Sequence, residues 1–221
     1  MSAPTLKDKY YPSLDGLRGL AIILVICFHY LGFITFFRFG WMGTDLFFVL
    51  SGFLITGRLA PYLSNKNLLS VFYRNRFLRI VPVYFSFLLM FFGVWIILSP
   101  ADDNHFFRQN GWTFFLFLQN WFMIADPAAS ENHLQHLWSL AVEEQFYLCY
   151  PFLLLLFYRY KYFMAGLITV MVMLIATRHI FVLIHPAGLD YRTVYWNSIF
   201  RFDAFLTGTL LYQLNTAYEG K

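Results

Sequence analysis

The stretch LDGLRGLAIILVICFHY (residues 14–30) holds a continuous apolar run between two ionisable side chains, Arg18 and His29. Such a run is typical of a helix that crosses a lipid bilayer, where an ionisable side chain is costly. The whole chain has the same character: its 221 residues are 59% hydrophobic and 13% charged, with a mean hydropathy of +0.56. This composition lies outside that of ordinary soluble domains and predicts an integral membrane protein.

Six apolar runs are long enough to cross a hydrocarbon layer of roughly 30 Å. They are residues 19–37, 41–60, 80–98, 137–157, 162–184 and 195–214. A shorter run, residues 112–125, predicts a re-entrant or interfacial helix. None of the runs alternates apolar and polar residues, which favours helices over barrel strands. The sequence therefore predicts an all-α polytopic transmembrane helix bundle of about six crossings, forming one domain over residues 1–221.

The basic residues predict how the chain is oriented in the membrane. With the N-terminus in the cytoplasm, eleven of the sixteen basic residues fall on the cytoplasmic side, as the positive-inside tendency requires. They are Lys7, Lys9, Arg18, Arg58, Lys66, Arg74, Arg76, Arg79, Arg159, Lys161 and Lys221. We therefore expect a plasma (inner) membrane protein with both termini in the cytoplasm and a first span that is kept as an anchor. The net charge of +4 then reports orientation, and nucleic acid is not an expected partner.

Arg18 and His29 are predicted to share one face of the first helix. Eleven residues at about 100° each make three turns plus roughly 20°, with a rise of about 16 Å. Arg18 should thus lie at the cytoplasmic end and His29 past the middle of the layer. Such a histidine either belongs to a functional site or bonds to a carbonyl of a neighbouring helix, and position alone leaves both readings open. In its neutral form the imidazole can act as a general base.

Further motifs follow the R-x10-H pair in a defined order. They are GWMGTDLFFVLSGFLIT (40–56), FYRNRFLRIVPVY (72–84), HLWSLAVEEQFYL (136–148) and RFDAFLTG (201–208). This series strongly resembles the membrane acyltransferase family 3. The resemblance implies an integral membrane enzyme that moves an acyl group, commonly acetyl from cytoplasmic acetyl-CoA, to a hydroxyl of an extracytoplasmic acceptor. The acceptor is usually a sugar of a surface polysaccharide, and in some members it is lipid-linked or a small molecule. The resemblance also implies that His29 is the catalytic residue.

Arg76 and Arg79 form an R-x-x-R pair whose spacing places both guanidinium groups on one side of a helix. Guanidinium groups fit phosphate oxygens geometrically. The resemblance assigns this motif to the acyl-donor side, so Arg76, Arg79 and Arg18 are the predicted acyl-CoA ligands. The alternative is that they are ordinary anchors near lipid phosphates.

The fourth predicted span opens with Trp138, Ser139 and the adjacent acids Glu143 and Glu144. Ser139 and Glu143 share a face and match an S-x-x-x-E pattern of the family. Two adjacent carboxylates in a membrane cannot both be ionised cheaply, so one should pair with a cation or keep its proton. We predict that Glu143 lies on the outer side and orients the acceptor hydroxyl or supports His29, with Trp138 and Ser139 as acceptor contacts. The alternative is an interfacial carboxylate beside an aromatic belt.

In the second span, Asp45 lies near the outer end, where it could orient the imidazole of His29. Gly43, Gly52 and Gly57 are predicted to permit close helix packing instead of chemistry. In the last span, Arg201 and Asp203 are two residues apart and cannot face each other, so each needs a partner elsewhere. His133 and His136 lack a third clustered ligand, and no metal site is predicted.

Two other classes of function compete with the enzyme. A proton-coupled transport protein would use His29, Asp45, Glu143 and Asp203 as a proton path, and an inactive scaffold would use none of them. Members of the family usually have about ten spans, so the resemblance covers about the first 60% of a family domain. Two alternatives follow: the chain is a truncated product, or a second copy or another subunit completes the bundle. Direct transfer and a covalent acyl-histidine intermediate both fit the residues.

Overall fold

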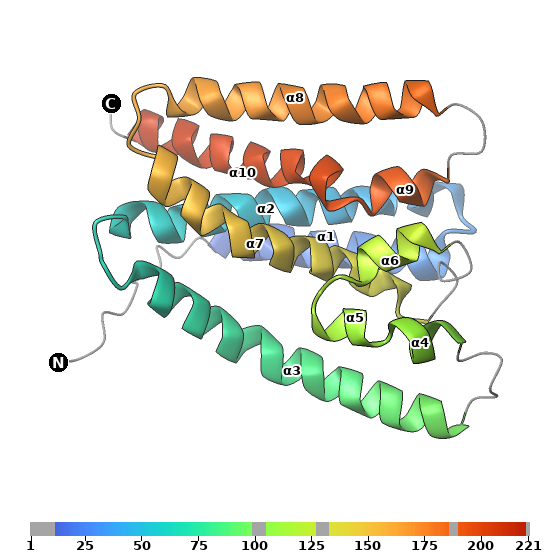
Figure 1. Cartoon of the computed structure of the whole chain (residues 1–221). Helices are drawn as coiled ribbons and strands as arrows, with labels where there is room; N and C mark the ends of the chain where they lie inside the picture. The colour runs from blue at the N-terminus through green and yellow to red at the C-terminus, as the bar shows by residue number, and fades with distance from the viewer. Residues whose placement is uncertain (1–11, 99–104, 127–132, 186–189, 220–221) are drawn as a thin grey trace. The chain divides into compact units, whose positions relative to one another are not determined.

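The computed structural model describes residues 12–98, 105–126, 133–185 and 190–219, and these ranges are helical without any β-strand. The long helices are α1 (Pro12–Leu31), α2 (Met42–Leu59), α3 (Leu68–Leu98), α7 (Trp138–Phe157), α8 (Phe163–Ile184) and α10 (Ser198–Glu219). Shorter ones are α4 (His105–Asn110), α5 (Trp112–Phe115), α6 (Gln119–Ala125) and α9 (Tyr191–Tyr195), with 3-10 segments η1 (Thr35–Trp41), η2 (Ala60–Tyr62) and η5 (Gln135–Leu137) (Figure 1). The all-α prediction is confirmed.

Five helical stretches of the described ranges are long and apolar enough to cross a membrane, judged by length and composition. They are Pro12–Leu31, Thr35–Tyr62, Leu68–Val94, Gln135–Phe157 and Phe163–Ile184. The sixth predicted span corresponds to α10, which is 22 residues long but is not among the five. Helix α10 is less apolar than the other long helices because it contains the charged residues Arg201 and Asp203. Its last turns are also polar, with Gln213, Asn215 and Thr216.

The first helix begins and ends earlier than predicted. The hydropathy pattern indicated residues 19–37, whereas α1 runs from Pro12 to Leu31. Proline is favoured in a first helical turn, and Asp15 interacts favourably with the helix N-terminus, so the polar start of the helix was missed by hydropathy. His29 consequently lies in the last turn of α1 and not deep along it.

The described residues form two compact units. The α3 unit comprises residues 64–98, 105–126, 133–148 and 190–198, and the α2 unit comprises 12–63, 149–185 and 199–219. Helix α7 therefore contributes its residues up to Leu148 to the α3 unit and those from Cys149 on to the α2 unit. The prediction of a single domain stays a prediction.

Helix α2 is the centre of the α2 unit because glycines let two helices approach its backbone. A Cβ at Gly43 would meet the Ala21 oxygen of α1, and one at Gly52 would overlap the Phe205 oxygen of α10. Gly208 of α10 in turn lies against the Val49 oxygen of α2. The predicted close packing is confirmed at these glycines, including Gly57, which faces the ring of Tyr212.

Helices α2 and α10 run parallel. Phe48 stacks on Phe205 with ring centroids 4.5 Å apart, and Thr56 donates a 3.2 Å hydrogen bond to Thr209. The Tyr150 hydroxyl of α7 lies 2.6 Å from Thr56 Oγ1 and 2.9 Å from Thr209 Oγ1. This buried hydroxyl cluster ties three helices together in an otherwise apolar interior.

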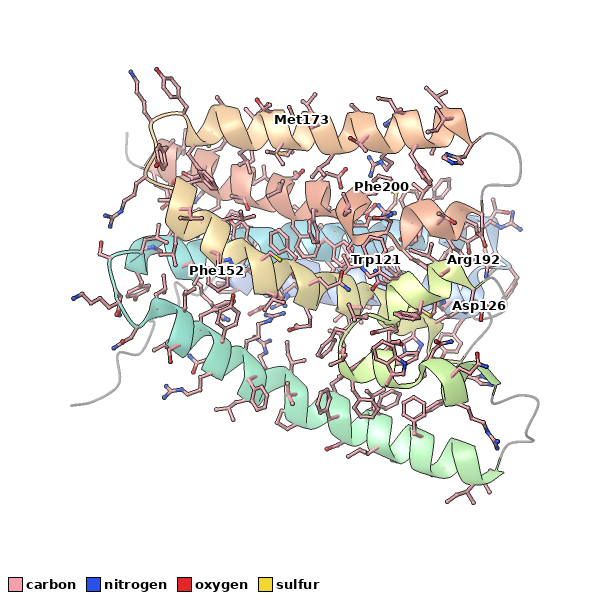
Figure 2. The ribbon with its side chains drawn as sticks, in the orientation of Figure 1. Trp121, Asp126, Phe152, Met173, Arg192 and Phe200 are labelled. Atoms are coloured by element: carbon pink, nitrogen blue, oxygen red, sulfur yellow. The ribbon has the colours of Figure 1, made fainter. Side chains whose placement is uncertain are left out.

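Helices α1 and α8 bury little of their surface. Ala21 is the buried residue of α1 and Leu167 that of α8, and α8 side chains such as Met173 are 60% exposed (Figure 2). Figure 1 shows α10 between α8 and α2. The contact between α8 and α10 includes the rings of Phe181 and Phe200, 5.4 Å apart. Such exposed apolar helices are compatible with lipid.

In the α3 unit, α3 and the first part of α7 run antiparallel. The Tyr73 hydroxyl donates to the Leu148 carbonyl at 2.8 Å. Further along α3, an aromatic core forms with the short helices and contains Tyr84, Leu88, Phe107, Phe114 and Leu134. This core holds the segment that the sequence predicted to be re-entrant or interfacial.

Residues 112–125 form two short helices joined by a tight turn. Phe117 in this turn has a φ of 55°, a conformation that non-glycine residues rarely adopt. Its ring stacks on Tyr84 at 4.7 Å, and its carbonyl accepts a 2.6 Å hydrogen bond from Gln145 Nε2. Irregular backbone in a membrane protein requires internal partners of this kind. The segment is therefore not a span, although its depth in the membrane stays a prediction.

The glycine contact between α2 and α10 gives a test of this packing. Gly52→Ala should destabilise the chain by about 1–3 kcal/mol, because the new methyl group forces the two backbones apart. The melting temperature in detergent, followed by circular dichroism, measures the effect.

The matched control is Gly166→Ala on α8, where a Cβ would meet nothing within 4 Å. This variant should leave the melting temperature within about a degree or two of the wild type, or raise it. Equal melting temperatures for the two variants would contradict the packing described for α2 and α10.

Candidate functional site

Arg76 is the centre of a charged cluster in the α3 unit. Its Nη2 lies 3.0 Å from Glu144 Oε1 and 3.4 Å from Glu143 Oε1, and its Nε donates to Glu144 at 3.3 Å. Its guanidinium carbon lies 3.2 Å from the ring centroid of Tyr147. The Tyr147 hydroxyl donates a 2.6 Å hydrogen bond to Glu143. One guanidinium group thus meets two carboxylates and one aromatic face.

This contact corrects one expectation from the sequence. Arg76 was expected on the cytoplasmic side and Glu143 on the outer side, but the two side chains lie together, so they cannot be on opposite sides of the membrane. The error arose because α3 and α7 are antiparallel helices that overlap along this region, which loop charges do not reveal. Of the two alternatives predicted for the adjacent carboxylates, a cation or a retained proton, the structure shows the cation.

The second arginine of the R-x-x-R pair has different surroundings. Arg79 is exposed, and within the described ranges it forms no ion pair or hydrogen bond. Arg74, on the same helix, is also exposed. Arg76, in contrast, is 17% exposed at its side chain. The two arginines of the motif therefore differ in their freedom to bind a ligand.

The predicted acceptor contacts lie where α7 begins. The Ser139 hydroxyl donates to the His136 carbonyl at 3.3 Å, which satisfies a carbonyl just before the helix. Trp138 is buried, with its ring 4.9 Å from that of Tyr195 and 6.4 Å from that of Trp196. The geometry gives Trp138 a packing role against α9.

A neutral polar network in the α3 unit was not predicted. Gln145 Oε1 accepts from Trp121 Nε1 at 3.1 Å (Trp121 is labelled in Figure 2) and from the Ser198 hydroxyl at 2.6 Å. Gln145 Nε2 donates to Asn120 Oδ1 at 2.9 Å, and Asn120 Nδ2 donates to the Trp196 carbonyl at 3.0 Å. The signal that could have indicated it is the polar pair Gln119 and Asn120 inside an apolar run.

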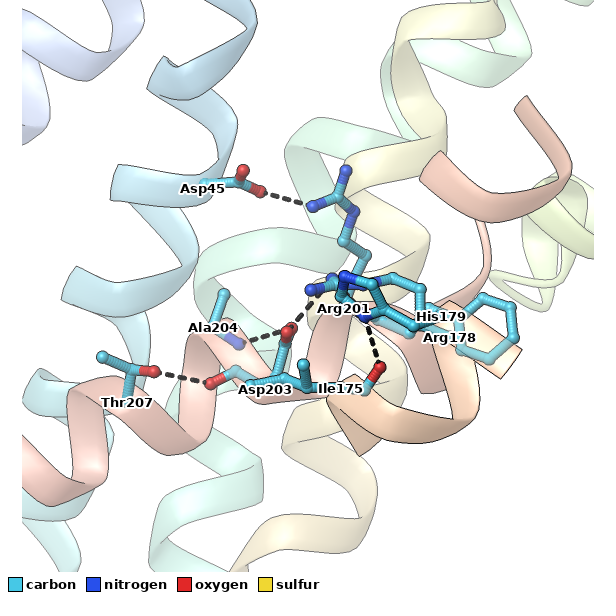
Figure 3. A network of polar contacts seen from close by, with 9 residues as sticks. Asp45, Ile175, Arg178, His179, Arg201, Asp203, Ala204 and Thr207 are labelled. Atoms are coloured by element: carbon cyan, nitrogen blue, oxygen red, sulfur yellow. Dashed lines mark hydrogen bonds and ion pairs between the residues drawn. The ribbon is translucent and has the colours of Figure 1, made fainter. Parts of the chain in front are cut away.

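Two ion pairs cross the α2 unit (Figure 3). Arg201 Nη1 of α10 lies 2.9 Å from Asp45 Oδ1 of α2, and Arg178 Nη1 of α8 lies 3.1 Å from Asp203 Oδ2 of α10. The prediction that Arg201 and Asp203 take partners on other elements is confirmed. The partner of Asp45 in the structure is thus Arg201, whereas the partner predicted from the sequence was His29.

His29 is exposed, and its ring lies 5.3 Å from that of Phe28. In the described part of the chain it forms no hydrogen bond with the protein. Arg18 lies with its guanidinium 5.3 Å from the ring centroid of Phe47 on α2. Because α1 is one continuous helix from Pro12 to Leu31, the two residues share a face as predicted.

The candidate residues therefore fall into separate groups. Arg76 and Glu143 belong to one cluster in the α3 unit, and Arg18, His29 and Asp45 belong to the α2 unit. Among the described residues, no group of three or more His, Cys, Asp or Glu side chains could hold a metal ion.

Comparison with known proteins adds to this geometry. The chain is 34% identical to YrhL of Bacillus subtilis over 220 residues, 94% of this chain and 34% of that protein. It is 33% identical to the peptidoglycan O-acetyltransferase OatA of Listeria monocytogenes and 31% identical to the O-acetyltransferase OatA of Staphylococcus aureus, covering 92% of this chain and 34% of each relative. The chain thus spans about a third of the length of these relatives.

None of the solved structures compared with the chain matches it. The model of a family described as an acyltransferase domain matches residues 11–220, which is nearly the whole chain. The chain accordingly belongs to the acyltransferase family 3 that its motifs resembled.

Proposed function

We propose that this chain transfers an acyl group, acetyl in the first place, from cytoplasmic acyl-CoA to a hydroxyl group of an extracytoplasmic carbohydrate polymer of the peptidoglycan type. The observation that carries the proposal is the family match over residues 11–220, which contains the R-x10-H pair on one continuous helix. The names of two relatives, O-acetyltransferase and peptidoglycan O-acetyltransferase, support acetyl as the transferred group and a glycan as the acceptor.

The proposed reaction needs one base, and His29 supplies it. In a direct transfer, the acceptor oxygen attacks the thioester carbonyl carbon while an imidazole nitrogen of His29 takes the hydroxyl proton. The C–S bond then breaks, and the leaving thiolate receives that proton from the imidazolium. The exposed ring of His29, with no protein hydrogen bond in the described ranges, leaves its nitrogens available for this exchange.

The remaining residues have proposed roles that follow from their surroundings. Arg79 of α3 and Arg18, in the second turn of α1, are candidates for binding the donor phosphates, because guanidinium groups bind phosphate oxygens. Glu143 is the candidate for orienting the acceptor, and Ser139 and Trp138 support the start of its helix. The proposed orientation places both termini in the cytoplasm.

The general base gives the first test of this function. His29→Gln should lower acetyl transfer from acetyl-CoA by about 10²- to 10⁴-fold, because this is the rate contribution that a positioned general base typically makes. The measurement is transfer of radiolabelled acetyl to a peptidoglycan fragment by the chain in nanodiscs.

The control is His179→Gln on α8, since the ring of His179 lies beside its own helix carbonyl, that of Ile175, at 2.7 Å. This change should leave transfer within about twofold of the wild type. Full transfer by the His29 variant, with the wild-type chain active, would exclude the proposed base.

The Asp45–Arg201 pair gives a second test, which separates stability from chemistry. Asp45→Asn should destabilise the chain by about 3 kcal/mol, because the guanidinium of Arg201 is largely buried and loses its carboxylate. The double variant Asp45→Asn/Arg201→Gln should recover part of this loss. Melting temperature and transfer rate are measured for each variant.

If Asp45 instead orients His29, Asp45→Asn should lower transfer by orders of magnitude at an almost unchanged melting temperature. Removing Arg201 would then give no recovery. The ion-pair role therefore predicts mainly a loss of stability, and the orienting role predicts mainly a loss of transfer rate.

A further inference from the structure

Arg76 and Arg79 belong to one motif but present very different surfaces to a ligand. The hydrogen-bonding edge of Arg76 meets Glu144 through Nε and Nη2, at 3.3 and 3.0 Å. One face of its guanidinium is covered by the ring of Tyr147 at 3.2 Å. A phosphate group could reach this edge only by displacing a carboxylate that already binds it.

The charge around Arg76 also opposes an anionic ligand. Two carboxyl groups, Glu143 and Glu144, lie within 3.4 Å of one guanidinium group. The cluster therefore carries a net negative charge when both carboxyl groups are ionised, and it is neutral when one of them is protonated. Phosphate would add further negative charge beside a guanidinium group that already contacts two carboxyl groups. The two carboxylates need a cation to compensate their charge, and Arg76 is that cation.

Arg76 instead fixes the position of Glu143. The carboxylate of Glu143 meets Arg76 Nη2 at 3.4 Å and accepts the Tyr147 hydroxyl at 2.6 Å. Tyr147 in turn stacks on the guanidinium, so three side chains hold one another in a closed arrangement. The carboxylate of Glu143, the candidate for orienting the acceptor, is therefore held by both Arg76 and Tyr147.

Arg79 has none of these restraints. It lies three residues further along α3, is exposed, and forms no ion pair in the described ranges. All its N–H donors remain available to a ligand. An exposed guanidinium on an apolar helix is the kind of group that a phosphate of the donor can recruit.

We propose that the two arginines divide the work of the motif: Arg79 binds the donor phosphate, and Arg76 is a positioning residue that holds Glu143 and Glu144. This inference rests on the proposed function, because it concerns the donor and acceptor of that reaction. Glu144, with its two contacts to Arg76, belongs to the same positioning cluster.

The test compares donor binding with turnover in matched variants of the whole chain in nanodiscs. Isothermal titration with CoA gives Kd, and acetyl transfer from acetyl-CoA gives kcat and KM. The variants Arg79→Gln, Arg76→Gln and Arg74→Gln each remove one positive charge from α3, and Arg74 is exposed and serves as the charge control.

Arg79→Gln should raise the Kd for CoA by about 10-fold or more, because losing a hydrogen bond between charged groups weakens binding by about that factor. The KM for the donor should rise with it. Arg76→Gln should change Kd by no more than Arg74→Gln does, while lowering kcat by about 10²-fold. Arg76→Lys, which keeps the charge without the planar edge, should restore part of kcat.

Arg76→Gln leaves two carboxyl groups without their cation and could impair folding. The double variant Arg76→Gln/Glu144→Gln removes one charge of each sign and should fold, as size-exclusion chromatography and circular dichroism will show. Its Kd for CoA is expected to stay close to that of the wild type.

The outcomes separate the two proposals. If the wild type binds CoA and the Arg76 variants lose it as strongly as Arg79→Gln does, the division of roles is wrong while the proposed function stands. An Arg79→Gln variant that binds CoA no more weakly than Arg74→Gln also overturns the division. A wild-type chain that neither binds CoA nor transfers acetyl refutes the proposed function, and the inference falls with it.

Discussion

The structure depends on one constraint: a charge placed among apolar helices must find its partner inside the protein. Arg201 meets Asp45, Arg178 meets Asp203, and Arg76 meets two glutamates. Each pair joins different helices, so each also fixes their relative position within its unit. Pairs of this kind cost more to break than to keep, because the remaining partner would be left uncompensated.

Close backbone packing explains why the Asp45–Arg201 pair forms where it does. Asp45 precedes Gly52 by seven residues, and Arg201 precedes Gly208 by the same interval, which is about two helical turns. Since α2 and α10 are parallel and meet at these glycines, Asp45 and Arg201 lie at the same height along the two helices. The two motifs that contain them therefore act as matching halves of one helix contact.

Much of the fold could be predicted from hydropathy and small residues, because both act locally along the chain. Five of the predicted spans correspond to apolar helices, and the glycine contacts of α2 follow from its stripe of small side chains. The contact of Arg76 with Glu143 could not be predicted, because it depends on how far two antiparallel helices overlap. The network around Gln145 was missed because neutral amides add nothing to the charge pattern, and the polar pair Gln119 and Asn120 does not reveal which distant residues it contacts.

The same constraint distinguishes the groups that hold the structure from those that can meet a substrate. A guanidinium group already paired with a carboxylate within the protein has little capacity left for an anionic ligand, as Arg76 and Arg201 illustrate. His29 and Arg79 lack such partners in the described ranges, although each lies on a helix with an apolar span. An unpaired ionisable group on such a helix is costly and needs a reason to be there. In the roles proposed for His29 as a base and for Arg79 as a ligand of phosphate, that reason is the substrate, which would supply the missing hydrogen bonds when it is bound.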